Sequence, residues 1–193
     1  MKRLRKWMRT SAALAAALAL NVGAQPLPED SVYQLQMPLR TQAGADAPLD
    51  VYRGHPVLIS MFYASCGYVC PMLVHSLQRL DQGLDAPARA KLRVLLVSFD
   101  AERDTPEVLK ETAAKHGVDT TRWTLASAAP EDVRKLAAVL GIRYRKLPDG
   151  GFNHATIVTL LDGDGRALAR SERPAQPDAE LIDALRKAAA ATP

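Results

Sequence analysis

The residues of this 193-residue chain that are best placed to do chemistry are its two cysteines, Cys66 and Cys70. A disulfide between them would close so short a loop that it would add little stability to the folded state. The close spacing therefore favours sulfur chemistry, either redox exchange or metal binding, over a structural bridge. The plain alternative is that both thiols are buried as small hydrophobic side chains.

The segments on either side of the cysteines favour a thiolate. Residues 56–63 form an apolar run rich in β-forming residues, which predicts a strand buried on both faces and ending just before Cys66. An apolar period near 3.6 predicts a helix that begins at Cys70 or Pro71 and continues to Leu84. The positive end of a helix stabilises a thiolate. If the first helical turn reaches back to Cys66, both sulfurs face one side and can share a metal ion.

Two sulfurs alone make an incomplete metal site, because copper(I) accepts two or three soft ligands and zinc prefers four. The third ligand is expected among the four histidines. His55, His75 and His116 have ordinary structural explanations, before a strand, inside a helix and at a helix C-terminus. His154 differs because it lies in a loop at the end of a strand expected to be central, and it is the candidate third ligand.

An acidic segment follows the next predicted strand, residues 93–99. Asp104 or Thr105 is expected to cap the helix that comes after it. Asp100 is not needed for that cap. It lies at the carboxyl end of a buried strand, the edge of an α/β sheet where sites usually form. We therefore expect Asp100 to support the metal ligands without binding the metal itself.

The remaining pattern alternates strands and helices, which predicts an α/β sheet with an antiparallel portion. A short N-terminal hairpin is expected from residues 33–37 and 49–52, and a second turn from Asp162–Gly165. Helices are expected at residues 105–115, 130–140 and 177–190, and further strands at 123–126, 156–161 and 167–169.

The charge distribution argues against a nucleic-acid partner. The formal charge of the whole chain is +4, but residues 1–24 hold five Lys or Arg and no acid, so the remainder carries 20 basic against 21 acidic side chains. That basic start precedes an apolar run at residues 11–20 and small residues up to Ala24, the pattern of a secretory signal. The run is too short to span a bilayer. We therefore expect a signal peptide at residues 1–24, a single domain at residues 25–193, a periplasmic location and no stable membrane span.

Three segments, taken together, resemble the Sco/SenC family of copper-binding proteins. They are residues 61–71 around the cysteines, residues 98–106 around Asp100, and Asn153 with His154 ahead of a strand and the Asp162–Gly165 turn. The resemblance covers roughly residues 30 to 190. It implies a thioredoxin-like fold with an added N-terminal hairpin and one copper ion, Cu(I) or Cu(II), held by Cys66, Cys70 and His154. It also implies a client, subunit two of cytochrome c oxidase or another periplasmic copper protein.

These residues are compatible with three functions. The first is a periplasmic copper metallochaperone that assists assembly of the copper centre of cytochrome c oxidase. The second is a thiol-disulfide oxidoreductase in which Cys66 and Cys70 are the catalytic pair. Against it, Cys-x3-Cys is not the usual redox spacing, and no proline lies between Asp149 and Arg173, where such enzymes normally carry one. The third is a binding module in which the cysteines serve stability alone.

Overall fold

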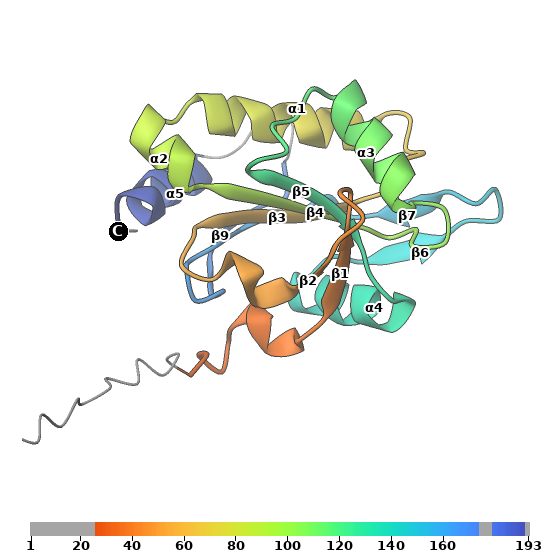
Figure 1. The fold of residues 1–193 in the computed structure, drawn as a ribbon, viewed down its shortest axis with the longest axis horizontal. Coiled ribbons are helices and arrows are strands. Elements are labelled where there is room, and N and C mark those ends of the chain that lie inside the picture. The colour runs from red at the N-terminus through yellow and green to blue at the C-terminus, as the bar shows by residue number, and fades with distance from the viewer. Residues whose placement is uncertain (1–25, 174–178, 192–193) are drawn as a thin grey trace, which may run out of the picture.

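A seven-stranded sheet runs through the middle of the protein in the order β2-β1-β5-β4-β3-β8-β9 (Figure 1). The computed structural model describes residues 26–173 and 179–191, so the signal segment predicted at residues 1–24 lies outside it. Strands β3, β4 and β5 are mutually parallel, and the other neighbours are antiparallel. The predicted α/β class is therefore confirmed. The strands are β1 Pro38–Thr41, β2 Asp46–Pro48, β3 Val57–Phe62, β4 Arg93–Ser98, β5 Trp123–Ser127, β8 Val158–Leu161 and β9 Ala167–Ser171.

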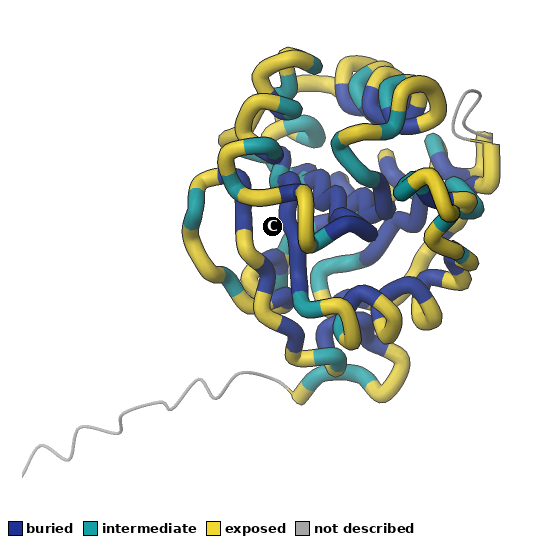
Figure 2. Tube along the Cα trace, turned by 90° about the vertical axis from the view of Figure 1, so that its right-hand side faces the viewer, coloured by how far each residue is buried: buried dark blue, intermediate teal, exposed yellow. Residues whose placement is uncertain are grey.

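Helices cover both faces of the sheet. One face packs against α1 Val69–Gln82, α3 Pro106–Lys115 and α5 Ala179–Ala191, and the other against α4 Pro130–Val139 and the N-terminal segment. Strand β3 serves both layers because its side chains alternate, with Ile59 in one apolar cluster and Leu58 in the other. All six residues of β3 are buried, as its continuous apolar sequence predicts. Figure 2 shows this buried layer between the more exposed helices.

The N-terminal hairpin is confirmed, but its predicted strand positions are wrong. Residues 32–35 form a 3-10 helix, η1 Val32–Leu35, and residues 49–52 form a second one, η2 Leu49–Tyr52. The paired strands β1 and β2 lie between them, closer to the turn. Val32 and Tyr33 of this 3-10 helix are buried in the core, so the loose alternation of apolar residues arises from a short buried helix and not from a strand.

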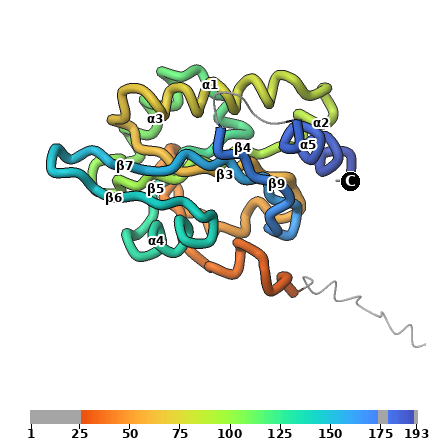
Figure 3. The backbone as a smooth tube through the Cα atoms, turned by 180° about the vertical axis from the view of Figure 1, so that it is seen from behind, coloured from red at the N-terminus to blue at the C-terminus, as the bar shows by residue number. Residues whose placement is uncertain are grey.

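A second hairpin, which the sequence pattern did not indicate, precedes β8. Strands β6 Tyr144–Lys146 and β7 Phe152–His154 form a separate two-stranded sheet that extends away from the body of the protein (Figure 3). The short helix α2 Ala86–Lys91 was also not predicted, and none of its residues is buried. Such short elements leave too few apolar positions for a periodic signal. No helix in the described ranges is long and apolar enough to cross a membrane.

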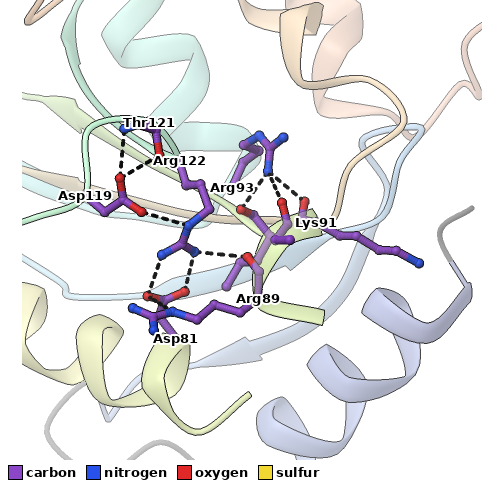
Figure 4. Close-up of polar contacts among 9 residues, drawn as sticks. Asp81, Arg89, Lys91, Arg93, Asp119, Thr121 and Arg122 are labelled. Carbon is purple, nitrogen blue, oxygen red and sulfur yellow. Dashed lines mark hydrogen bonds and ion pairs between the residues drawn. The ribbon is translucent and has the colours of Figure 1, made fainter. Parts of the chain in front are cut away.

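An ion-pair network stabilises the edge of the sheet where β4 and β5 begin. The Asp81 carboxylate, almost fully buried, accepts hydrogen bonds from Arg122 at 2.5 and 3.0 Å and from Arg89 at 3.1 Å (Figure 4). Arg122 also pairs with Asp119 at 3.0 Å. Nearby, Arg93 donates to three backbone carbonyl groups at the end of α2. The functional residues considered next lie at the opposite edge, because they follow the carboxyl ends of β3 and β4.

Candidate metal centre

The cysteine loop connects the buried end of β3 to the start of α1. The backbone N–H of Cys70 donates to the sulfur of Cys66, and the two atoms are 3.3 Å apart. Helix α1 begins at Val69, so its first turn does not reach back to Cys66. The sulfurs therefore share one side because of the turn before the helix, and not because of helical periodicity. They are not bonded to each other; Cys66 is half-buried and Cys70 is buried.

The two thiols differ in acidity. Burial raises the pKa of the Cys66 thiol, but hydrogen bonds to Cys70 and to Tyr63 and Tyr68 outweigh it, so that this pKa lies below its ordinary value. Burial raises the pKa of the Cys70 thiol far above its ordinary value, and the nearby Cys66 and Asp104 add to the rise. Cys66 is therefore the thiol that ionises first, and it is also the more accessible one.

His154 reaches the cysteines from the end of β7, where it pairs with Tyr144 across the hairpin. Its ring lies 5.0 Å from the Phe99 ring and 5.9 Å from the Tyr63 ring, measured between centroids. Burial lowers the pKa of His154, which favours the neutral imidazole that binds metals. Its Nδ1 lies 3.2 Å from the carbonyl oxygen of Ala155, and a bond donated there leaves the Nε2 lone pair available to a metal.

The structure brings the three predicted ligands together. The two sulfurs and one ring nitrogen of His154 all lie within 4.8 Å of one another. Cysteine sulfur and imidazole nitrogen bind ions such as zinc at about 2.0–2.3 Å, so donor atoms in a trigonal site lie roughly 4 Å apart. A small inward movement would therefore let all three reach one ion. Two sulfurs and one imidazole are a donor set that suits copper.

The other three histidines do not join this cluster among the described residues. His55 precedes β3 at the opposite edge of the sheet, and burial lowers its pKa. His75 is exposed on α1, and His116 forms the C-cap of α3. His116 does line a cavity of about 290 Å³ that also borders Cys66, between the cysteine loop and α3.

Asp100 and Asp104 both lie in the turn after β4. Asp100 is buried, its N–H donates to the Ser98 hydroxyl at 2.8 Å, and its carboxylate pairs with Arg103. Within the described chain, no hydrogen bond joins Asp100 to Cys66, Cys70 or His154. The Asp100 carboxylate therefore contacts Arg103 and not the candidate ligands, and its expected support of them stays a prediction.

Asp104 is the acid that contacts the cysteine loop. Its Oδ2 accepts hydrogen bonds from the Ala64 N–H at 2.9 Å and from the Ser98 hydroxyl. Thr105, and not Asp104, caps α3, because the Thr105 hydroxyl accepts from the Val108 N–H. The sequence allowed either residue as the cap, which hid this second role. Tyr63 ends an apolar run in the sequence, which gives no sign that its side chain contacts both Cys66 and His154.

The mixed sheet carries a Cys-x3-Cys loop at the carboxyl edge of its parallel strands and a histidine folded back from a later hairpin, which fits the thioredoxin-like class that the sequence resemblance implies. Comparison with known proteins agrees with this. The family model described as SCO1/SenC matches residues 28–190. The chain therefore belongs to the SCO1/SenC family, as the three segments of its sequence indicated.

Individual relatives are distant but cover most of the chain. The SCO1 protein homolog of Bacillus subtilis is 23% identical over 76% of this chain and 77% of its own. ScoI of Bradyrhizobium japonicum, solved with copper bound, superposes with a TM-score of 0.65 at 23% identity, covering 79% and 96% of the two chains. A SCO1/SenC family lipoprotein of Bacillus anthracis gives a TM-score of 0.70 at 22% identity, covering 79% and 92%. These structures confirm the thioredoxin-like fold.

Proposed function

We propose that this protein is a copper metallochaperone that holds one copper ion through Cys66, Cys70 and His154. The observation that carries this proposal is the approach of three soft or borderline donor atoms to within 4.8 Å of one another, although 84 residues separate Cys70 from His154 along the chain. Copper-bound structures of relatives, among them ScoI of Bradyrhizobium japonicum, support the choice of metal.

The donor set suits a metal that must be passed on. Two sulfurs satisfy copper(I), and the imidazole adds a donor that copper(II) accepts as well. Three protein ligands leave a position at which a donor from a client can enter, which a closed four-ligand site would not. Both thiols must be reduced and deprotonated to bind, so a Cys66–Cys70 disulfide should be unable to load.

The cellular setting that we propose is the bacterial periplasm, with residues 1–24 as an export signal. The support is the basic and apolar pattern of that segment and the family match. The client that we propose is the copper centre in subunit two of cytochrome c oxidase, which the family resemblance implies. The near-neutral charge of residues 25–193 gives no reason to expect nucleic acid as a partner.

A copper titration tests the metal site. Reduced protein should bind one equivalent of copper(I) and one of copper(II). Cys66→Ala and Cys70→Ala should lose both, whereas His154→Ala should bind copper(II) much more weakly, at a measurable affinity, and keep most of its copper(I) affinity. His116→Ala is the matched control, because His116 borders the same loop but lies outside the cluster. Unchanged copper(II) binding in the His154 variant would remove the third ligand from the proposal.

The difference between the two thiols favours one alternative, a thiol-disulfide oxidoreductase. An accessible Cys66 of lowered pKa could attack a partner's disulfide, and the buried Cys70 could resolve the mixed disulfide. In that case His154→Ala would keep its activity on a disulfide substrate, and Cys70→Ser would trap the mixed disulfide through Cys66. Trapping with no measurable copper binding would establish the alternative instead.

A further inference from the structure

The hairpin that carries His154 lies outside the main sheet. Strands β6 and β7 pair only with each other among the described residues, and Figures 1 and 3 show the pair extending beyond the sheet. A two-stranded hairpin on its own is marginally stable in water. The position of the imidazole therefore depends on the side-chain contacts that dock this hairpin onto the body.

Aromatic contacts hold both strands of the hairpin against the body of the protein. The Phe99 ring, just after β4, lies 4.7 Å from the Tyr144 ring and 6.0 Å from the Phe152 ring, measured between centroids. Tyr63 adds a contact with Phe152 at 5.2 Å. Such ring pairs are worth only about 0.5–1.5 kcal/mol each beyond the area that they bury. They involve residues of the two strands and not the turn between them.

Arg103 holds the turn of the hairpin. Its Nε donates to the buried Asp100 carboxylate, and its Nη2 donates to the carbonyl oxygen of Gly150 in the hairpin turn. Gly150 has φ +85°, and a Cβ there would lie 3.0 Å from the Arg103 guanidinium. The glycine thus provides both the turn conformation and the space for the arginine. A second link, from Lys146 to Glu102 at 3.1 Å, joins the same two segments, and it is exposed like the bond from Arg103 to Gly150.

The hairpin can transmit this restraint to His154. Its turn is closed by hydrogen bonds from Leu147 N–H to Gly151 O at 2.8 Å and from Gly150 N–H to Leu147 O at 3.0 Å. Only three residues lie between Gly150 and His154 on the returning strand. The turn that carries Arg103 is itself fixed, since Asp104 in the same turn binds the N–H of Ala64 in the cysteine loop at 2.9 Å. The turn after β4 therefore contacts both the cysteine loop, through Asp104, and the hairpin that carries His154, through Arg103.

We propose that Arg103 is a positioning residue that keeps the β6–β7 hairpin where His154 can reach a metal held by Cys66 and Cys70. The inference rests on the proposed copper function. The buried Asp100 carboxylate orients the Arg103 guanidinium, so Asp100 acts on the metal ligands through Arg103. The bonds of Arg103 should therefore matter for copper(II), which needs the imidazole. They should not matter for copper(I), which the two sulfurs satisfy.

The test compares copper(II) and copper(I) affinity in Arg103→Gln. Loss of a residue that orients a metal ligand costs about 10- to 100-fold in affinity, and we expect that loss for copper(II) with a change of less than about two-fold for copper(I). Because Arg103→Gln leaves Asp100 without its partner, a variant combining it with Asp100→Asn removes the buried charge as well and should behave alike. Arg145→Gln is the control, because Arg145 is exposed on the same hairpin and has no ion pair within the described residues.

A double-mutant cycle separates positioning from general loss of structure. In a His154→Ala background, Arg103→Gln should cause no further loss of copper(II) affinity, because the group that it positions is gone. A metal-free measurement adds a second readout. Amide hydrogen exchange at Leu147 and Ala155 in the reduced protein should speed up in Arg103→Gln and stay unchanged in Arg145→Gln.

The inference is overturned if Arg103→Gln binds copper(II) as the Arg145→Gln control does, if both copper states weaken equally, or if the loss persists in the His154→Ala background. Failure of the proposed function looks different. In that case the wild-type protein itself binds no copper, or binds it equally well without Cys66.

Discussion

Asp104 allows a direct test of how the cysteine loop is held in place. The side chain is 2% exposed, and one carboxylate oxygen accepts hydrogen bonds from the Ala64 N–H and the Ser98 hydroxyl. Asp104→Ala removes the acceptor of both. Asp104→Asn puts an amide oxygen in the same place and removes only the charge, so the two variants separate the hydrogen bonds from the electrostatics.

The expected magnitudes follow from the burial of the two donors. A buried donor left without a partner costs about 1–3 kcal/mol. Ser98 is fully buried, whereas Ala64 is half-buried and water can replace part of its bond. We therefore expect Asp104→Ala to lower the free energy of unfolding by about 2–4 kcal/mol. Asp104→Asn should stay within about 1 kcal/mol of wild type, because burial already disfavours the charge that it removes.

The pH dependence of the comparison has a definite sign. Burial raises the pKa of Asp104 above 3.8, against the opposing effect of its bonds to Ser98 and Ala64. A carboxyl group whose pKa rises on folding contributes stability below its unfolded pKa and loses that contribution as the pH rises through its folded pKa. Relative to Asp104→Asn, wild type should therefore be less stable at pH 7 than at pH 4.

Denaturant unfolding of the reduced, metal-free protein at both pH values is the assay, with the slope against denaturant as the check that both variants unfold as one unit. Equal destabilisation by the alanine and asparagine variants would show that the charge, and not the hydrogen bonds, holds the loop. A wild type that gains stability relative to Asp104→Asn as the pH rises would contradict the direction assigned to the pKa.

Three further predictions concern reactivity and stability. At pH 7, iodoacetamide should modify Cys66 well before Cys70, and the rate of Cys66 labelling should fall as the pH drops through the lowered pKa of this thiol. Mass spectrometry of quenched samples measures both rates. Preferential labelling of Cys70 would contradict the prediction. Asp81→Asn should cost about 3 kcal/mol in denaturant unfolding, the low end for a broken buried pair because Arg122 retains Asp119, with copper affinity unchanged. A silent substitution would refute the role of the network. Gly165→Ala should lower the melting temperature much more than Gly44→Ala. Both glycines have positive φ, but only at Gly165 would the added methyl meet a carbon of the buried Tyr33 ring, at 2.6 Å. Equal shifts of the melting temperature would refute this.

The parts of the fold that the sequence predicts well are those where burial is continuous or periodic. Strand β3 is buried at every position and was expected from its apolar run. The N-terminal segment was misplaced because Tyr33 and its neighbours alternate in a way that a buried 3-10 helix also produces. The hairpin of β6 and β7 has three residues in each strand, too few for a period of two to stand out.

In the candidate site, the sequence predicts the residues but not the contacts between segments that lie far apart in the chain. The thiol pair and the identity of His154 follow from residue types, spacing and family resemblance. The contacts that organise them do not, because Arg103 and Gly150 are 47 residues apart and meet only through the folded hairpin. Nor does the sequence decide between Asp100 and Asp104, since both follow the same strand and only the turn geometry directs Asp104 to Ala64.

The architecture places the donors of the candidate site on elements of unequal rigidity. Cys70 is buried among the core side chains of α1 and β3, so the position of its sulfur is fixed by the packing of the main sheet. His154 belongs to a hairpin outside that sheet, docked by contacts of Phe99 and Tyr63 with Tyr144 and Phe152 and by one arginine. A donor that can leave independently lowers the barrier to ligand exchange, because a client ligand needs to displace only the imidazole. For a protein whose proposed task is to bind copper and then release it, the weak attachment of the third ligand is therefore the expected design, and stiffening the hairpin should slow transfer.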